Sequence, residues 1–159
     1  MEPIIVYTDG GCSGNPGPGG WGFAIVRNQN IVHDAAGTSP HTTNNKMELT
    51  AIHEALAYIE TTYGRSHVIL RTDSNYAINS ISKWAHGWKK KGWVKSDGKP
   101  IENPELIQAI YQLCYRSTLD VEFSKVKAAH DVVGTNLFDP FNDHVDLLAT
   151  GKRKPGARS

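Results

Sequence analysis

The chain has 159 residues and a formal net charge of +1, with 39% hydrophobic and 21% charged residues. This length suits a single domain that buries its own core without disulfide staples, and the composition excludes an intrinsically disordered chain. The sequence lacks a run of the ~18 apolar residues that a membrane span requires, and its near-neutral charge alone predicts no polyanionic partner.

The chain start and the cysteines indicate the compartment. Met1-Glu2-Pro3 carries neither the basic nor the apolar region of a secretory signal. Cys12 and Cys114 are far apart in the sequence, so a disulfide between them is one interpretation and a reduced chain is the other. We favour a reduced, cytoplasmic chain without a membrane segment, because paired cysteines are typical of secreted proteins.

The first third of the chain predicts an antiparallel meander. Residues 4–8 are a short β-branched apolar run, typical of a buried strand, and Asp9 follows them. The glycine-rich residues 10–20 predict a turn. Residues 21–26 and 31–36 predict two further strands, joined by a hairpin turn at Asn28-Gln29-Asn30.

The clearest helical pattern covers residues 45–63. Apolar side chains recur there at spacings of three and four, at Leu49, Ile52, Leu56 and Ile59. Gly64 marks the end of this helix. Residues 67–70 predict a strand that runs into Thr72-Asp73, and Ser74 can cap a following helix.

The second half of the chain continues to alternate strands with helices. Residues 84–93 predict a short helix or a loop, and a helix begins at Asn103-Pro104. Residues 121–126 predict the last strand, and in Asp139-Pro140 an aspartate caps a final helix that begins with proline. This order predicts an α/β (α+β) fold with a mixed sheet and helices packed against it.

Two strands end in the same dipeptide, Thr8-Asp9 and Thr72-Asp73. A helical crossover between these strands would make them parallel and neighbouring, so both carboxylates would meet at one edge of the sheet. Close carboxylates repel each other unless a divalent cation neutralises them. The alternative is that each aspartate only stabilises a turn.

Two further acids have an ordinary structural explanation. Glu48 lies on the buried stripe of the 45–63 helix, but Asn45-x-x-Glu48 also fits a capping box, in which the acid bonds back to the helix start. Asp146 lies beside Val145 and Ala149 on the final helix, where an acid on the helix flank needs no function. The residues alone favour these structural readings.

Two segments suggest contact with nucleic acid, and one histidine needs the same weighing. The glycine-rich turn does not fit a phosphate-binding loop, because a strand follows it, yet it would let another backbone approach, with Asn15 facing sugar or phosphate. Residues 84–93 interleave three tryptophans with lysines, which suits phosphates and stacked bases, although a lysine run is usually a solvated face. His130 follows a strand, and a lone histidine is usually structural or exposed.

Four segments resemble, in order, the motifs of the type 1 ribonuclease H family. They are residues 8–20, residues 42–49, Thr72-Asp73-Ser74 and the pattern Asn142-x-x-x-Asp146-x-Leu148-Ala149. Residues 84–93 are similar to the basic protrusion of the bacterial members. The resemblance implies a five-stranded mixed sheet flanked by helices in a catalytic domain of residues 1–150. For the basic tail that follows, residues 151–159, disorder is the default expectation, and an auxiliary contact with nucleic acid is the alternative.

The resemblance implies an endonuclease that hydrolyses the RNA strand of RNA–DNA hybrids and leaves 5′-phosphate and 3′-hydroxyl ends. It implies two Mg²⁺ ions, with Mn²⁺ as a substitute, held by Asp9, Glu48, Asp73 and Asp146. His130 would assist catalysis, whereas His144 is expected to tolerate substitution. The enzyme would bind the hybrid duplex as a monomer.

The resemblance also implies which residues contact each strand. Contacts to RNA 2′-hydroxyls, which distinguish RNA from DNA, are expected from Cys12, Asn15, Asn44 and Asn75. Contacts to the DNA strand are expected from Thr43, Asn45, Trp84, Lys89, Lys90, Lys91 and Asn103.

The sequence departs from the family pattern at three places. His41 stands where the family often has an arginine for a DNA phosphate, Asn75 stands where it often has glutamine, and the loop between His130 and Pro140 is longer than usual. Two alternatives stay open: a hybrid-binding domain without catalysis, and another nuclease of the same superfold, such as an exonuclease or a junction resolvase. The four acids argue against the first, and the protrusion and the 2′-hydroxyl loop against the second.

Overall fold

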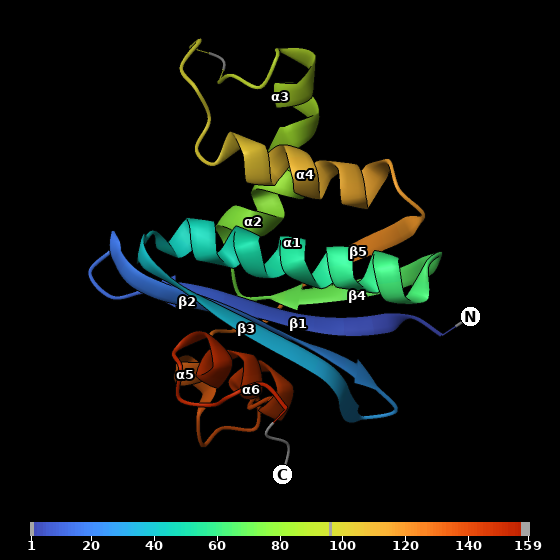
Figure 1. Ribbon diagram of the computed structural model, residues 1–159, viewed down its shortest axis with the longest axis vertical. Coiled ribbons are helices and arrows are strands. Elements are labelled where there is room, and N and C mark those ends of the chain that lie inside the picture. Colours follow the sequence, from blue (N-terminus) through green and yellow to red (C-terminus); the bar gives the residue numbers. More distant parts are fainter. Residues whose placement is uncertain (1, 96, 157–159) are drawn as a thin grey trace.

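The computed structural model describes residues 2–95 and 97–156, and a five-stranded sheet in the order β3-β2-β1-β4-β5 lies at its centre (Figure 1). The strands are β1 (Ile4–Cys12), β2 (Gly17–Arg27), β3 (Asn30–Thr42), β4 (Ser66–Thr72) and β5 (Leu119–Lys125). β2 is antiparallel to both β1 and β3, whereas β4 is parallel to both β1 and β5. The predicted mixed sheet is confirmed.

The glycine-rich segment is mostly strand, so the prediction of a turn over residues 10–20 is wrong. Its first residues extend β1 to Cys12, and β2 begins already at Gly17. Glycine inside these strands lets helices of both faces approach the backbone closely, one at Gly10 and one at Gly20. The predicted hairpin turn is confirmed: Asn28 and Gln29 have φ values of 52° and 62°, as a tight turn of this type requires.

One face of the sheet carries most of the helices (Figure 1). They are α1 (Asn44–Tyr63), α2 (Asn75–Asn79), the π-helical turn η1 (Ser80–Trp84), α3 (Ala85–Lys90) and α4 (Pro104–Tyr115). The predicted apolar stripe of α1 is fully buried and joins β1, β4 and α4 in the larger core. This core fixes the strand ends that carry Asp9 and Asp73.

The start of α1 differs from the predicted capping box. Thr43 is the cap, and its Oγ1 accepts a 3.2 Å hydrogen bond from the amide of Lys46. Asn45 lies inside the helix, so it does not form a box with Glu48. The Glu48 side chain is therefore available for another contact.

The opposite face carries α5 (Ala129–Val132) and α6 (Pro140–Ala149). Asp139 caps α6 as predicted, because its Oδ1 accepts a 2.9 Å hydrogen bond from the amide of Phe141. A Cβ added to Gly20 would lie 2.4 Å from the carbonyl oxygen of Ala149, so glycine in β2 allows α6 to lie directly on the sheet. The buried apolar residues of this face form a second, smaller core: Tyr7, Ala24, Val26, Val145 and Leu148.

The structure describes the basic tail as far as Gly156. Arg153 and Gly156 make hydrogen bonds to His144 of α6 and Asp34 of β3, while residues 157–159 lie outside the described part. Among residues 2–95 and 97–156, no helix has the length and apolar character needed to cross a membrane.

Candidate active site

Asp9 and Asp73 lie side by side because their strands are parallel neighbours. Tyr7 of β1 pairs with Arg71 of β4, so two residues later both strands bring an aspartate to the same edge of the sheet. Asp9 is only 9% exposed. The juxtaposition predicted from the repeated Thr-Asp dipeptide is confirmed.

A close contact between α1 and β1 brings Glu48 to the same edge. A Cβ added to Gly10 would lie 2.3 Å from the backbone carbon of Met47, so only glycine permits this approach. The Gly10 amide donates a 2.5 Å hydrogen bond to Oε1 of Glu48. As a result, carboxylate oxygens of Asp9, Glu48 and Asp73 lie within 4.8 Å of one another.

Burial and mutual repulsion both disfavour the charged form of this cluster. Burial, and next the charge of Asp73, raises the pKa of Asp9 to about 8. Burial and the charges of Asp9 and Asp73 raise the pKa of Glu48 well above its ordinary value, and burial raises the pKa of Asp73. Such carboxylates take up protons unless a positive charge joins them, so the cluster favours a cation.

The donor chemistry fits a hard divalent metal ion. All three side chains offer oxygen ligands, as Mg²⁺ prefers. Oε2 of Glu48 is buried, and none of the described residues donates a hydrogen bond to it. Buried acceptors are normally satisfied, and a bound cation would satisfy this one. Asp9, Glu48 and Asp73 are thus the residues that could hold the ion.

The fourth acid, Asp146, reaches the site from the opposite face of the sheet. It is half-buried on α6 and lines, together with Asp9, a groove of about 650 Å³. Its charge adds to burial, the largest cause, in raising the pKa of Asp9 and of Asp73. The structure therefore brings Asp146 beside the three-acid cluster, which among the described residues does not itself include Asp146.

One residue near the acids, Lys125, escaped the sequence analysis. The Nζ of Lys125 donates a hydrogen bond to the backbone oxygen of Asp73, and its charge opposes the effect of burial on the Asp73 pKa. Asn142 is buried and donates a 2.8 Å hydrogen bond to the carbonyl of Lys127, which ties α6 to the end of β5. Lys125 comes close to Asp73 because it pairs with Thr72 of β4, and this pairing is known only once the strand order is known.

Three of the residues expected to contact RNA form one hydrogen-bonded group. Oδ1 of Asn44 accepts from the Cys12 amide at 2.9 Å, and the Asn44 amide donates to Oδ1 of Asn15 at 3.0 Å. Cys12 and Asn44 also line the groove that contains Asp9. Asn75, by contrast, is exposed at the start of α2, apart from this group.

Three of the residues expected to contact DNA lie around the starts of α1 and α4: Thr43, Asn45 and Asn103. Thr43 is partly engaged as the α1 cap. Nδ2 of Asn45 lies 3.5 Å from Oε1 of Glu102, next to Asn103, so α1 and the segment before α4 meet here. Asn103 takes a left-handed φ of 53° immediately before α4. The DNA contacts themselves stay a prediction.

The tryptophan and lysine segment has both structural and exposed members. Trp88 and Trp93 pack against the larger core, whereas Trp84 is 45% exposed. Lys90 and Lys91 are exposed, while Nζ of Lys89 lies 5.3 Å from the centroid of the Tyr111 ring. The expectation of aromatic contact with nucleic acid therefore narrows to Trp84.

The histidines have unequal environments. His130 lies on α5, is 78% exposed and pairs with Asp131 at 3.2 Å, outside the three-acid cluster, so its catalytic role stays a prediction. His41 is exposed near the end of β3. His144 is 3% exposed and lies 2.8 Å from Oδ2 of Asp34, so its side chain belongs to a buried contact, and its tolerance of substitution stays a prediction.

Comparison with known proteins agrees with this geometry. The RNase H family model matches residues 1–154. A ribonuclease H from Acidovorax sp. (strain JS42) is 39% identical over 149 residues, covering 94% of this chain and 93% of its own. LC9-RNase H1, a type 1 RNase H with the type 2 active-site motif, superposes with a TM-score of 0.74 and 28% identity, over 98% of this chain and 76% of that one.

LC11-RNase H1, solved in complex with an RNA/DNA hybrid, has a TM-score of 0.60 at 24% identity, covering 93% of this chain and 94% of its own. The carboxylates at the strand ends, together with the family match, identify the chain as a nuclease, a member of the hydrolases. The chain belongs to the ribonuclease H family and is an enzyme with ribonuclease H function.

Proposed function

We propose that this enzyme cuts the RNA strand of RNA–DNA hybrids endonucleolytically, by a two-metal-ion mechanism that leaves 5′-phosphate and 3′-hydroxyl ends. The observation that carries the proposal is the buried cluster of Asp9, Glu48 and Asp73, with Asp146 beside it, in a chain of the ribonuclease H family. LC11-RNase H1, of the same fold, is known in complex with an RNA/DNA hybrid.

Asp9, Glu48, Asp73 and Asp146 would hold two Mg²⁺ ions, with Mn²⁺ as a substitute. When bound, the ions would activate the attacking water and stabilise the leaving oxygen. The Gly10 amide orients Glu48 toward the proposed metal site, because it binds one carboxylate oxygen and leaves the other available to a metal ion. His130 would act as an auxiliary proton carrier at the reacting phosphate.

The groove beside Asp9 suits a nucleic-acid strand. Its lining includes backbone of the glycine-rich segment together with Cys12 and Asn44, which are joined by the 2.9 Å hydrogen bond. Hydroxyl recognition needs such a mixture of donors and acceptors, and a 2′-hydroxyl both donates and accepts. Asn15, Asn44 and Cys12 would therefore select RNA over DNA. Asn75 would contact the same RNA strand at another nucleotide.

The DNA strand would lie toward α3 and α4. Thr43, Asn45 and Asn103 would contact its backbone, and Trp84 would offer an exposed aromatic face. Lys89, Lys90 and Lys91 would neutralise phosphates, which makes binding weaker as salt rises.

Cleavage of three duplexes in Mg²⁺ tests the proposal: RNA–DNA, RNA–RNA and DNA–DNA of one sequence. We expect cleavage of the RNA strand of the hybrid only, with internal cuts and 5′-phosphate ends. Binding of the hybrid without cleavage would identify a binding domain instead. Cleavage of DNA, or removal of nucleotides from one end, would identify another nuclease of the same superfold.

The site needs a single chain, because all four acids come from it, and we therefore propose a monomer. Both cysteines are free, which suits the reducing cytoplasm as the proposed location. The catalytic domain would comprise residues 1–150, followed by the basic tail.

A further inference from the structure

α6 carries Asp146 but rests on little apolar surface. The apolar contact between α6 and the sheet is the smaller core, to which α6 contributes Val145, Leu148 and the half-buried Phe141. A packing face of this size sets the rotation of α6 only coarsely, because apolar attraction is non-directional. A directional contact would set the direction of Asp146 more closely.

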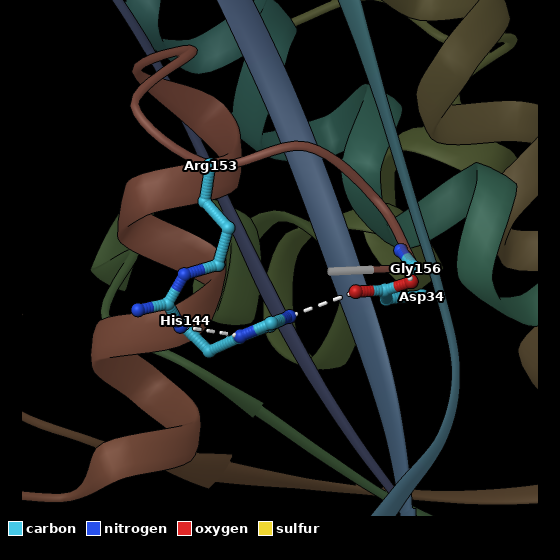
Figure 2. A network of polar contacts seen from close by, with 4 residues as sticks. All are labelled: Asp34, His144, Arg153 and Gly156. Atoms are coloured by element: carbon cyan, nitrogen blue, oxygen red, sulfur yellow. Dashed lines mark hydrogen bonds and ion pairs between the residues drawn. The ribbon is translucent and has the colours of Figure 1, made fainter. Parts of the chain in front are cut away.

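A buried polar network supplies such a contact (Figure 2). Nε2 of His144, on α6, lies 2.8 Å from Oδ2 of Asp34 on β3, and these two side chains are 3% and 1% exposed. Nη1 of Arg153 lies 2.6 Å from Nδ1 of the same imidazole. The Gly156 amide donates a 2.7 Å hydrogen bond to the other oxygen of Asp34. Tail, helix and strand are thus joined.

The hydrogen-bond roles in this network follow from its chemistry. A guanidinium group only donates, so Nδ1 of His144 accepts from Arg153. Nε2 then carries the ring hydrogen and donates to the Asp34 carboxylate. A buried network whose members are satisfied holds one arrangement, and without Arg153 the imidazole would lose the donor that fixes its orientation.

The end of α6 is built to return the tail to this network. Gly151 has a φ of 77°, its amide donates to the carbonyl of Leu148 at 3.2 Å, and the Lys152 amide donates to that of Leu147 at 2.9 Å. This pair of bonds is a Schellman motif, which reverses the chain after a helix. The reversal carries Arg153 back alongside His144, one turn before the helix end.

We propose that Arg153 is a positioning residue, which acts through His144 and Asp34 to fix the rotation of α6 and hence the placement of Asp146 in the carboxylate site. The inference rests on the proposed function, because the direction of Asp146 matters only if it is a metal ligand. The basic tail would therefore serve the metal site.

Matched substitutions in the full-length protein test this inference. Arg153→Met removes the donor but keeps an unbranched side chain, and Lys154→Met removes the same charge from an exposed neighbour. Mg²⁺ affinity is measured without substrate, from the shift of Tm with Mg²⁺ concentration; kcat and KM for a hybrid are measured in parallel.

We expect Arg153→Met to weaken Mg²⁺ binding roughly tenfold, the lower range for groups that orient a metal ligand, with an unchanged KM for the hybrid. Arg153→Lys retains a donor and should recover most of the affinity. Lys154→Met should match the wild type. Asp34→Asn disturbs the network from β3 and should also weaken Mg²⁺ binding.

Two results would overturn the inference. Unchanged Mg²⁺ affinity in Arg153→Met, with a lower Tm, would reduce Arg153 to a structural role. A raised KM with unchanged Mg²⁺ affinity would make the tail a nucleic-acid contact. If the wild type bound Mg²⁺ but left hybrids intact, the proposed function would fail. The role of Arg153 would still be decided, because it depends on the difference in Mg²⁺ affinity between Arg153→Met and Lys154→Met.

Discussion

The two faces of the sheet hold their parts of the active site by different means. On the α1 face, the larger core packs strands and helices together over their whole length, and it carries Asp9, Glu48 and Asp73. On the α6 face, the buried apolar cluster is much smaller. There, polar contacts hold the helix that carries Asp146.

These polar contacts occur at both ends of α6. At its start, the Tyr7 hydroxyl donates to Oδ2 of Asp139 at 2.6 Å and accepts from Arg71 at 3.2 Å. Toward its end, His144 connects the helix to β3 and to the tail. A helix on a small packing surface thus relies more on directional bonds, whereas a large core fixes the backbone beneath its acids mainly by shape.

The largest expected effect is common to both faces. Asp9→Asn, Asp73→Asn, Glu48→Gln and Asp146→Asn should each lower hydrolysis of a hybrid in Mg²⁺ by roughly a thousandfold or more, because each removes a proposed metal ligand worth several kcal/mol. Single-turnover rates measure this, with circular dichroism to confirm folding. Near wild-type activity in Asp146→Asn alone would show that the α6 face is dispensable.

Glycine substitutions compare how firmly each face is packed. Gly10→Ala places a Cβ 2.3 Å from the Met47 backbone and should destabilise the protein by about 3 kcal/mol. Gly20→Ala places one 2.4 Å from the Ala149 carbonyl oxygen and should cost about 1 kcal/mol, because α6 can shift on its small cluster.

Urea unfolding measures both glycine variants. Gly87→Ala is the control, since a Cβ there meets nothing within 4 Å and alanine favours the helix. Equal losses of stability at Gly10 and Gly20 would show that the two faces are equally rigid.

His130 is the proposed catalytic residue of α5, on the same face of the sheet as α6. His130→Ala should lower kcat by roughly tenfold to a hundredfold with little change in KM, because an auxiliary proton carrier touches the reacting phosphate only. His67→Ala is the matched control, since His67 lies at the start of β4 and pairs with Glu122 at 3.9 Å. An unchanged kcat in His130→Ala would exclude this histidine from the chemistry.

The smallest expected effect concerns stability without metal. The pKa of Asp9 is raised to about 8 by burial and by the charge of Asp73, whereas an unfolded aspartate titrates near pH ~3.9. The folded chain therefore keeps a proton that the unfolded chain loses, and stability falls as pH rises from about 4 to about 8. Asp9→Asn should flatten this decline and raise stability by about 1 kcal/mol at neutral pH.

Melting temperatures at pH 5 and pH 8, in EDTA and in Mg²⁺, check this expectation. Mg²⁺ should stabilise the wild type more than Asp9→Asn, because the ion neutralises the clustered carboxylates and the variant has one carboxylate fewer to bind it. Asp146→Asn should raise the stability of the metal-free protein less, since Asp146 is more exposed than Asp9. A lower Tm for metal-free Asp9→Asn at both pH values would indicate a structural role for Asp9.

The sequence by itself determined the features that depend on neighbouring residues and on simple connection rules. The apolar stripe of α1, the cap at Asp139 and the turn at Asn28 are local patterns, and the structure confirms them. The meeting of Asp9 and Asp73 also followed, because a helical crossover between two strands makes them parallel.

Only the tertiary structure decided the partners of residues that have several local options. Glu48 fits a capping box by sequence, but the contact between α1 and β1 turns it toward Gly10. The glycine-rich segment resembles a turn, yet its two ends pair with each other as β1 and β2, with Gly11 opposite Gly20 and Cys12 opposite Gly19. Asp34 and His144 are 110 positions apart, and Arg153 joins them only because α6 ends by reversing the chain. Such contacts depend on packing across the sheet, which no local pattern encodes.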